Sequence, residues 1–267
     1  MDAPLEQQFG NEEMWRTVFA KGDPILKKMQ WWNSKLPQKP RCKLCMAPFE
    51  GIGGWIMRRR GKARNSRNPN FCNACDGFLE AFPGGAEIDM SMLYVDVRQS
   101  TEYAVQHTAA DVSERINQFL NLAIDIITAN DGFIQAFYGD CIVAAWPPGF
   151  CGSDHAIKSQ NAALALVHDK RMVAQDGKPI PIGVGVHSGK VFISTVSALK
   201  GTFRDVSIFG SNVNLTARLA SRAKAQEVLA SAENIIAADA QIDDFECELA
   251  ELKGFSDPVK VYKIAGS

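Results

Sequence analysis

The chain has 267 residues, 46% of them hydrophobic, and a formal net charge of −1. This length suffices for one large domain and a small module, while the balanced charge gives no overall attraction to nucleic acid or an anionic membrane. No apolar run approaches the ~20 residues of a membrane span, and the amino-terminus, MDAPLEQQFGNEE, lacks the basic and apolar regions of a signal peptide. We therefore expect a cytoplasmic protein whose seven cysteines are metal ligands or buried thiols.

Residues 1–40 are expected to form one or two short helices. Apolar residues recur at helical spacing at Met14, Trp15, Val18 and Phe19. Asp23 followed by Pro24 is typical of a second helix start, and that segment runs to a pair of tryptophans. An apolar stripe of this kind packs on its own domain or on a partner chain.

Two CxxC pairs follow, Cys42 with Cys45 and Cys72 with Cys75. Such pairs present four thiolates at the tetrahedral spacing of a structural zinc site. We therefore predict that residues 41–85 form a small zinc-ribbon-like module with one Zn²⁺ per chain. An iron–sulfur cluster and mononuclear iron are the alternative metal centres, while a redox-active disulfide lacks the surrounding βαβ pattern.

A basic segment, residues 57–67 (MRRRGKARNSR), lies between the two pairs and carries six cations. A run of this kind is usually a solvated face, and no interleaved aromatic residues support nucleic-acid contact, so nucleic acid is not an expected partner. Asp76 is expected to cap a short helix through Phe82. Residues 83–85, Pro-Gly-Gly, are expected to link the module to the next domain.

Residues 86–267 are expected to form an α+β domain. The predicted order is a strand over 90–97, a helix start at 100, a helix over 110–130, a hairpin over 133–146, a helix over 154–173, two strands within 180–194, a strand over 206–209, a helix over 212–224, a strand at 228–229, a helix over 232–238 and two terminal strands. This order is that of an α+β sandwich of the ferredoxin-like palm type.

Two carboxylates stand at strand ends in this domain. Asp96 comes near the end of the first strand, and Asp140 sits at the turn of the hairpin. Strand-end carboxylates on adjacent strands can share hard cations, which take oxygen ligands. In the predicted helix over 212–224, Asn214 and Arg218 are four residues apart and therefore share one helix face.

Together these stretches resemble the class III nucleotidyl cyclase catalytic domain. That family has an aspartate after a strand that leads into a phosphate loop, a Gly-Asp hairpin, and a glycine–x–x–valine–asparagine helix that ends in an arginine. Residues 182–188 (IGVGVHS) and 252–262 (LKGFSDPVKVY) are supporting matches. The resemblance covers about residues 88–264, and the five motifs in this order are specific, although each alone is weak.

The resemblance implies that a nucleoside triphosphate, ATP by default, becomes a 3′,5′-cyclic nucleotide and pyrophosphate with two Mg²⁺ or Mn²⁺ ions per site. It implies that Asp96 and Asp140 hold these metals. Arg218 is implied to stabilise charge in the transition state, and Asn214 to orient the ribose. Because the family draws the metals and the Asn/Arg pair from different chains, a homodimer is implied. The implied phosphate contacts are Arg98, Gln99, Ser100, Thr101 and Lys253.

The sequence departs from the family at the positions that choose the base. Ala136 stands where adenylate cyclases typically carry lysine and guanylate cyclases glutamate, while Ser207 fits some adenylate cyclases. Gln99 replaces the usual glycine of the phosphate loop. A pyrimidine cyclase that makes cUMP or cCMP in antiphage signalling is therefore the alternative function. An inactive nucleotide-binding sensor, and a nucleic-acid-binding zinc module with an idle cyclase domain, are the alternatives of other classes.

Overall fold

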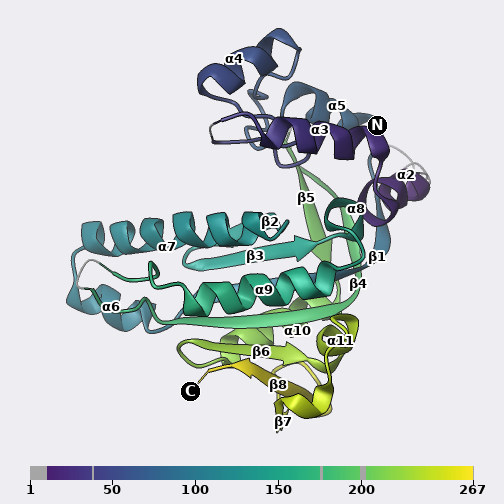
Figure 1. Cartoon of the computed structure of the whole chain (residues 1–267). Helices are drawn as coiled ribbons and strands as arrows, with labels where there is room; N and C mark the ends of the chain where they lie inside the picture. The colour runs from purple at the N-terminus through teal and green to yellow at the C-terminus, as the bar shows by residue number, and fades with distance from the viewer. Residues whose placement is uncertain (1–10, 38, 175–176, 199–202, 267) are drawn as a thin grey trace. The chain divides into compact units, whose positions relative to one another are not determined.

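The computed structural model describes residues 11–37, 39–174, 177–198 and 203–266 (Figure 1). The chain divides into two compact units. The first comprises Met1–Ile88 and Phe192–Phe209, and the second comprises Asp89–Val191 and Gly210–Ser267.

Helices open the first unit. α2 (Glu12–Arg16) continues into a π-helical turn, η1 (Thr17–Lys21), and α3 (Pro24–Ser34) follows. The predicted start of α3 is confirmed, because the carboxylate of the preceding Asp23 accepts a hydrogen bond from Leu26 N at 2.7 Å. Trp15, Val18 and Phe19 of the predicted apolar stripe are buried within this unit, whereas Met14 is exposed. The rings of Trp15 and Phe19 stack there, and both residues are fully buried. The first ten residues of the predicted helical segment lie outside the described part.

The cysteine-rich part of the first unit contains two further helices, α4 (Gly51–Arg59) and α5 (Asn73–Ala81). Asp76 lies inside α5 and is not its cap, which corrects the prediction. The carboxylate is buried and accepts hydrogen bonds from the side chains of Asn68 and Arg204. Asp76 therefore bonds to Arg204, which lies 128 residues later in the chain, instead of capping a helix.

A β-hairpin belongs to the same unit. β5 (Phe203–Phe209) pairs antiparallel with the second half of β4 (Ile182–Ala198). Two ion pairs join β5 to the cysteine-rich part: Arg204–Asp76 at 3.4 Å and Lys43–Asp205 at 3.1 Å. The cysteine-rich part is thus bonded to the strand that carries Ser207.

The second unit is built on a mixed sheet (Figure 1). In the described part of the chain its strand order is β2-β3-β1-β4-β6-β8-β7, and β5 pairs with β4 off this path. The parallel pair is β4 with β6, whereas β1 and β3 are antiparallel. The strands not yet given are β1 (Gly85–Val97), β2 (Phe133–Tyr138), β3 (Cys141–Trp146), β6 (Glu227–Ser231), β7 (Glu246–Ala250) and β8 (Val259–Ala265).

Helices cover both faces of this sheet, which confirms the predicted α+β class. Val228 and Ala230 of β6 belong to the core with α7 (Ala109–Ala129) and α9 (His155–His168), whereas Leu229 belongs to the core with α10 (Ser211–Arg222). Alternate residues of a strand point to opposite faces, so α10 lies on the face opposite α7 and α9. The remaining short elements are α6 (Ser100–Gln106), α8 (Pro148–Cys151), α11 (Ala232–Ala237) and η2 (Ile242–Asp244).

Two predicted elements differ from the structure. β4 is one continuous strand that includes Gly189, whereas two strands were predicted within residues 180–194. This glycine is needed for a close approach: a Cβ there would lie 2.7 Å from Asn212 Nδ2, at the start of α10. The helix predicted to run to Val173 is α9, which ends at His168, where Asp169 begins a turn by accepting a hydrogen bond from Arg171 N.

Candidate functional site

Asp96 and Asp140 lie next to each other at the ends of neighbouring strands. Asp96 is the second-last residue of β1 and pairs with Cys141, and Val97 N donates to Asp140 O at 3.3 Å. Burial raises the pKa of Asp96, the nearby Arg98 guanidinium partly offsets this rise, and the charge of Asp140 adds to it. The predicted pair of strand-end carboxylates is therefore brought together.

This pair fits divalent cations. Asp140 Oδ2 is buried and accepts no hydrogen bond from the described residues. A cation bound there would satisfy this oxygen and offset the repulsion between the two carboxylates. Burial, together with both carboxylates, raises the pKa of Cys141 to about 12, so its thiol stays neutral. The donor set is thus made of oxygen, which suits Mg²⁺ or Mn²⁺.

The segment between β1 and α6 is the predicted phosphate loop. Gln99 adopts a left-handed backbone with φ of 57°, a conformation in which glycine is unstrained. This accounts for the glycine expected at that position in relatives. Ser100 and Thr101 are the first residues of α6, and the first amides of a helix lack partners within it, so they can receive an anion.

Arg98 has a different set of contacts. Its amide donates to Pro181 O at 2.7 Å, and its guanidinium donates to Ala220 O at 2.6 Å and lies 3.2 Å from Asp96 Oδ2. Arg98 therefore joins the end of β1 to the end of α10, while its Nε is buried without a partner among the described residues. Sequence reasoning missed this role, because the acceptor lies 122 residues away at the end of α10.

α10 presents the predicted Asn/Arg pair. Asn214 and Arg218 lie one turn apart on this helix, while Leu215 and Leu219 pack into the core. Asn214 is exposed and Arg218 is half-buried. Neither side chain hydrogen-bonds to another residue of the described chain, so both can contact a group outside it.

The remaining predicted site residues are spread over three elements. Ala136 lies in β2, opposite Val143 and directly after a register shift. Ser207 lies in β5, opposite Ser194, and belongs to the first unit, whereas Ala136 belongs to the second. Lys253 is exposed in the turn between β7 and β8.

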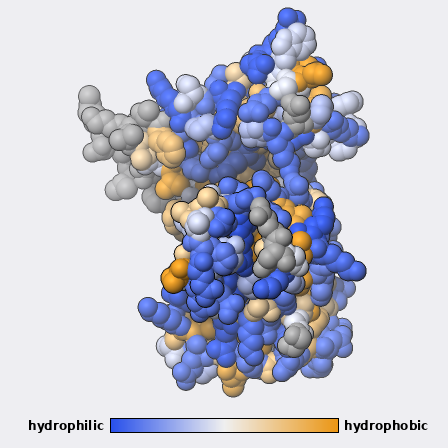
Figure 2. Space-filling view, turned by 90° about the vertical axis from the view of Figure 1, so that its left-hand side faces the viewer, coloured by the Kyte–Doolittle hydropathy of each residue, from blue (hydrophilic) through white to orange (hydrophobic). Residues whose placement is uncertain are grey.

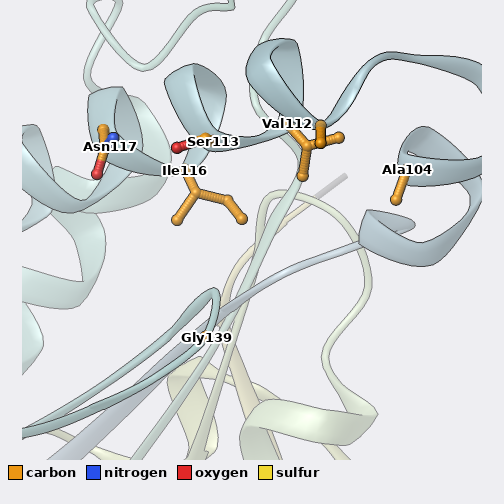
Figure 3. Close-up of a pocket in the computed structure, with 7 residues that line it drawn as sticks. Ala104, Val112, Ser113, Ile116, Asn117 and Gly139 are labelled. Atoms are coloured by element: carbon orange, nitrogen blue, oxygen red, sulfur yellow. The ribbon is translucent and has the colours of Figure 1, made fainter.

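An open pocket of about 480 Å³ lies beside the turn that precedes Asp140 (Figure 3). Val112 and Ile116 of α7 project into it above Gly139, and Ala104 of α6 closes one side. The lining is mainly apolar and contains no cation among the described residues. The pocket lining therefore offers no positive charge to a triphosphate.

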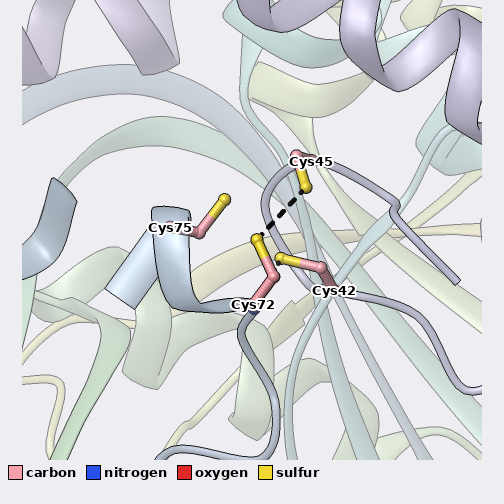
Figure 4. A group of neighbouring side chains, drawn as sticks. All are labelled: Cys42, Cys45, Cys72 and Cys75. Atoms are coloured by element: carbon pink, nitrogen blue, oxygen red, sulfur yellow. Dashed lines mark hydrogen bonds between the residues drawn. The ribbon is translucent and has the colours of Figure 1, made fainter. Parts of the chain in front are cut away.

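The four predicted zinc ligands form one cluster (Figure 4). Their sulfur atoms all lie within 4.8 Å of one another, and all four residues are buried. Three of them lie on loop segments, and Cys75 lies in the first turn of α5. Hydrogen bonds with its three neighbouring thiols, Cys42 first, lower the pKa of Cys72, whereas hydrogen bonds with the other three thiols, again Cys42 first, raise the pKa of Cys75. Four thiols this close cannot all ionise alone, whereas a bound cation permits it.

A buried polar network in the second unit was also missed. Ser188 Oγ lies 2.6 Å from Ser91 Oγ and 2.9 Å from Asn234 Nδ2, and Ser91 reaches His155 Nδ1 at 2.8 Å. These side chains come from β1, β4, α9 and α11, and they join the sheet to its helices. The sequence signal for this network was the presence of single small polar residues, such as Ser91 and Ser188, within apolar strands.

Comparisons with known proteins point to one family. The family model of the adenylate and guanylate cyclase catalytic domain matches residues 86–266. An adenylate cyclase of Dictyostelium discoideum, described as terminal-differentiation specific, is 27% identical over 186 residues, which are 66% of this chain and 8% of that protein. Uncharacterized proteins of Mycobacterium tuberculosis are 27% identical over 191 residues, or 34% of their length. The chain thus spans about a third or less of these relatives.

Solved structures agree over the same region. The adenylyl cyclase CyaB from P. aeruginosa is 26% identical with a TM-score of 0.61, over 68% of this chain and 96% of that one. The guanylyl cyclase Cya2 is 24% identical with a TM-score of 0.62, over 68% and 94%. These matches confirm the cyclase palm fold. Through residues 86–266, this chain belongs to the adenylate and guanylate cyclase catalytic domain family, the class III cyclases.

Proposed function

We propose that this chain is an active nucleotidyl cyclase, which converts a nucleoside triphosphate, ATP by default, to a 3′,5′-cyclic nucleotide and pyrophosphate. The observation that carries the proposal is the Asp96–Asp140 pair at the ends of β1 and β3, with a buried carboxylate oxygen that lacks a partner. A protein that only bound nucleotide would not need this arrangement beside an Asn/Arg helix.

Asp96 and Asp140 hold two Mg²⁺ or Mn²⁺ ions in this proposal, and these ions lower the pKa of the 3′ hydroxyl and neutralise phosphate charge. The loop amides at Gln99, Ser100 and Thr101 receive the terminal phosphates at the start of α6. Lys253 is a further triphosphate contact, because it is exposed and its charge is not paired with another described residue.

Arg218 stabilises the charge that develops on the α-phosphate, and Asn214 orients the ribose. Both side chains point away from the core of their own chain. We therefore propose a homodimer with two shared sites, in which one copy supplies the carboxylates and the other supplies Asn214 and Arg218. A two-fold axis completes both sites at once.

The base is assigned to adenine by default. Ser207 can donate or accept a hydrogen bond, whereas the methyl group of Ala136 can do neither. An adenylyl cyclase and a guanylyl cyclase match the chain about equally well, so the default assignment to ATP rests on Ser207. The side chain of Ala136 cannot form a hydrogen bond with an edge of the base. UTP and CTP are therefore the competing substrates. The substrates are cytoplasmic metabolites, and we place the protein in that compartment.

One assay tests the function. The purified chain is incubated with ATP, GTP, CTP and UTP in turn with Mn²⁺, and the products are identified by mass. The proposal predicts a cyclic nucleotide of the expected mass from ATP. A cyclic pyrimidine nucleotide as the main product would mean that the substrate is UTP or CTP and not ATP. Absence of any cyclic product would favour a nucleotide sensor.

Variants separate catalysis from folding. Asp96→Asn and Asp140→Asn should each reduce turnover by at least about a hundredfold under saturating Mn²⁺, because a metal ligand is lost. The matched control is Asp244→Asn, which changes an exposed aspartate of η2 and should retain activity. Near wild-type turnover in either site variant would reject the metal assignment.

A further inference from the structure

The near-zero net charge of the chain hides a strong asymmetry. Residues 24–81 carry twelve Lys/Arg and three Asp/Glu, a net charge of +9. The rest of the chain carries seventeen Lys/Arg and twenty-seven Asp/Glu, a net charge of −10. Even with four thiolates and one Zn²⁺ included, this segment keeps a net charge of +7. The segment that contains α3, α4 and the cysteine cluster is therefore a basic module on an acidic protein.

α3 exposes three of its large apolar side chains, whereas Leu26 and Met29 are half-buried. Polar groups also bond on its inner side: Gln30 Nε2 donates to Leu44 O at 2.8 Å, and Asn33 Nδ2 donates to Cys45 O at 2.7 Å. On the outer face Ile25, Trp31 and Trp32 are 70%, 54% and 57% exposed. A helix of a soluble protein normally buries such residues, so this face indicates a partner.

α4 repeats this arrangement. Gly53 and Gly54 face inward, and their lack of a Cβ permits close packing against Pro37 O and Phe49 O. The outer face carries Ile52, 73% exposed, and Trp55, 49% exposed. Gly53 of α4 thus packs against the segment that follows α3. Pale and orange side chains stand among blue ones in this part of the space-filling view (Figure 2).

Cations accompany the exposed tryptophans. Lys35 Nζ lies 3.7 Å from the ring centroid of Trp31, and Arg59 Cζ lies 4.1 Å from that of Trp55. Further basic side chains on the same two helices and at their ends are exposed: Lys27, Lys28, Arg58 and Arg60. Aromatic, aliphatic and cationic groups are thus intermixed on the exposed faces of the two helices.

We propose that the outer faces of α3 and α4 form a docking surface for a lipid bilayer that contains anionic lipids. Tryptophan prefers the interface of a bilayer, where its ring is apolar and its N–H stays wet. Ile25 and Ile52 enter the headgroup boundary beside it, and the lysine and arginine side chains extend to the lipid phosphates. The proposed association is peripheral, and no helix among the described residues is long and apolar enough to cross a membrane.

The two isoleucines distinguish the bilayer from nucleic acid. Nucleic acid would use the cations and could stack a base on Trp31 or Trp55, but it offers no apolar environment to an aliphatic side chain. A bilayer uses all three groups. The charge of the module fits the negative surface of such a membrane, where each basic residue contributes about fivefold in affinity.

Vesicle binding tests the proposal with the full, metal-containing chain. The protein is mixed with phosphatidylcholine vesicles, with and without about 30% phosphatidylglycerol, and separated by flotation. We expect the protein to float with the anionic vesicles, to float at least about tenfold less with the neutral ones, and to be released at high salt. Failure to float with anionic vesicles would overturn the proposal.

Matched variants identify the surface. The double variant Ile25→Ser/Ile52→Ser should bind anionic vesicles at least about tenfold more weakly. Its control, Ile236→Ser/Leu249→Ser, changes two exposed aliphatic residues of the second unit, 62% and 68% exposed, and should bind like the wild type. Equal vesicle binding by the two variants would overturn the proposal.

Two other occupants give distinct results. If the surface binds nucleic acid, a single-stranded oligonucleotide binds the wild type and the double variant equally well, while vesicles bind neither. If it contacts a second copy, the double variant changes the molecular mass of the lipid-free protein in solution. Either result contradicts the bilayer assignment. Neither depends on cyclase activity, so the proposed reaction is tested separately.

Discussion

Arg98 holds Asp96 and the end of α10 together. Its guanidinium lies 3.2 Å from Asp96 Oδ2 and donates to Ala220 O at 2.6 Å. A cation beside the last carbonyl groups of a helix is favourable because those carbonyls lack partners within the helix. The strand that carries a candidate metal ligand is thereby fixed to the helix that carries Asn214 and Arg218.

Removing this guanidinium should alter the metal dependence of activity. In Arg98→Met the cation that lowers the pKa of Asp96 is gone, so this pKa rises further. The carboxyl then stays protonated to a higher pH, and protons compete better with the metal. We expect a higher half-saturating Mn²⁺ concentration below pH 7 and recovery as the pH rises.

The control for this variant is Arg222→Met at the same end of α10. Arg222 pairs with Glu248 at 2.7 Å and does not contact Asp96. Its Mn²⁺ dependence should equal that of the wild type at each pH. Identical Mn²⁺ titrations for the two variants would reject the positioning role of Arg98.

Removing one cysteine ligand should release the metal and unfold the cysteine-rich part. Elemental analysis of the wild type should find about one zinc per chain. Binding of a structural zinc is worth on the order of 10 kcal/mol, and this is folding free energy. Cys72→Ser should therefore lose the metal and the first thermal transition, while the exposed Cys247→Ser keeps both. A metal-free wild type with an unchanged transition would show that the cysteines are not ligands.

Stability of the second unit should fall as the pH drops. Burial lowers the pKa of His187, although Glu233, Asn212 and Asp89 partly offset this, and burial also lowers the pKa of His155. Each histidine is therefore neutral in the folded chain at a pH where the unfolded chain, with a pKa of about 6.5, takes up a proton. The stabilising contribution is complete above that value and is lost as the pH falls toward the lowered pKa.

Denaturant unfolding at pH 7.5, 6 and 5 measures this loss. Each buried histidine should contribute up to about 1.4 kcal/mol per pH unit within the window. His187→Gln should flatten the decline, and the exposed His168→Gln should leave it unchanged. A decline of the same slope in both variants would mean that other groups cause it.

Breaking the contact between β5 and α5 should destabilise the first unit. The side chain of Arg204 is 13% exposed and bonds to Asp76, which is 9% exposed, and to Glu80. Arg204→Ala leaves a buried carboxylate with fewer donors, at a cost of about 1–3 kcal/mol. Arg171→Ala removes an exposed pair with Asp169 and should cost less than about 1 kcal/mol. Equal losses of unfolding free energy would contradict a structural role for Arg204.

The sequence predicted the parts of the site whose signals are local. A glycine–aspartate turn between two apolar runs positions Asp140, and four-residue spacing on an amphipathic helix positions Asn214 with Arg218. The CxxC spacing likewise brings two thiols together within one turn. The predicted clustering of all four cysteines is confirmed by sulfur atoms within 4.8 Å.

Features that depend on distant partners were not predictable in this way. Asp76 reads locally as a helix cap, but its partner Arg204 lies 128 residues later. Gly189 lies inside a strand that was predicted as two, and glycine is needed there because the start of α10 passes beside β4. The balanced total charge gave no sign that residues 24–81 are strongly basic, since the acidic remainder cancels them.

In the proposed dimer each active site takes Asp140 from one copy of the chain and Arg218 from the other. Arg218→Ala should be inactive alone because charge in the transition state is no longer stabilised, and Asp140→Asn because a metal ligand is lost. In a mixed dimer one site carries both defects, while the other takes Asp140 from the arginine variant and Arg218 from the aspartate variant.

The measurement is cyclase activity of the two inactive variants after they are mixed and their subunits exchange. Random pairing makes about half of the dimers mixed, each with one intact site of two, so activity should recover to roughly a quarter of wild type. Recovery requires Asp140 and Arg218 to come from different chains. A mixture whose subunits exchange measurably and that remains inactive would contradict the cross-chain site.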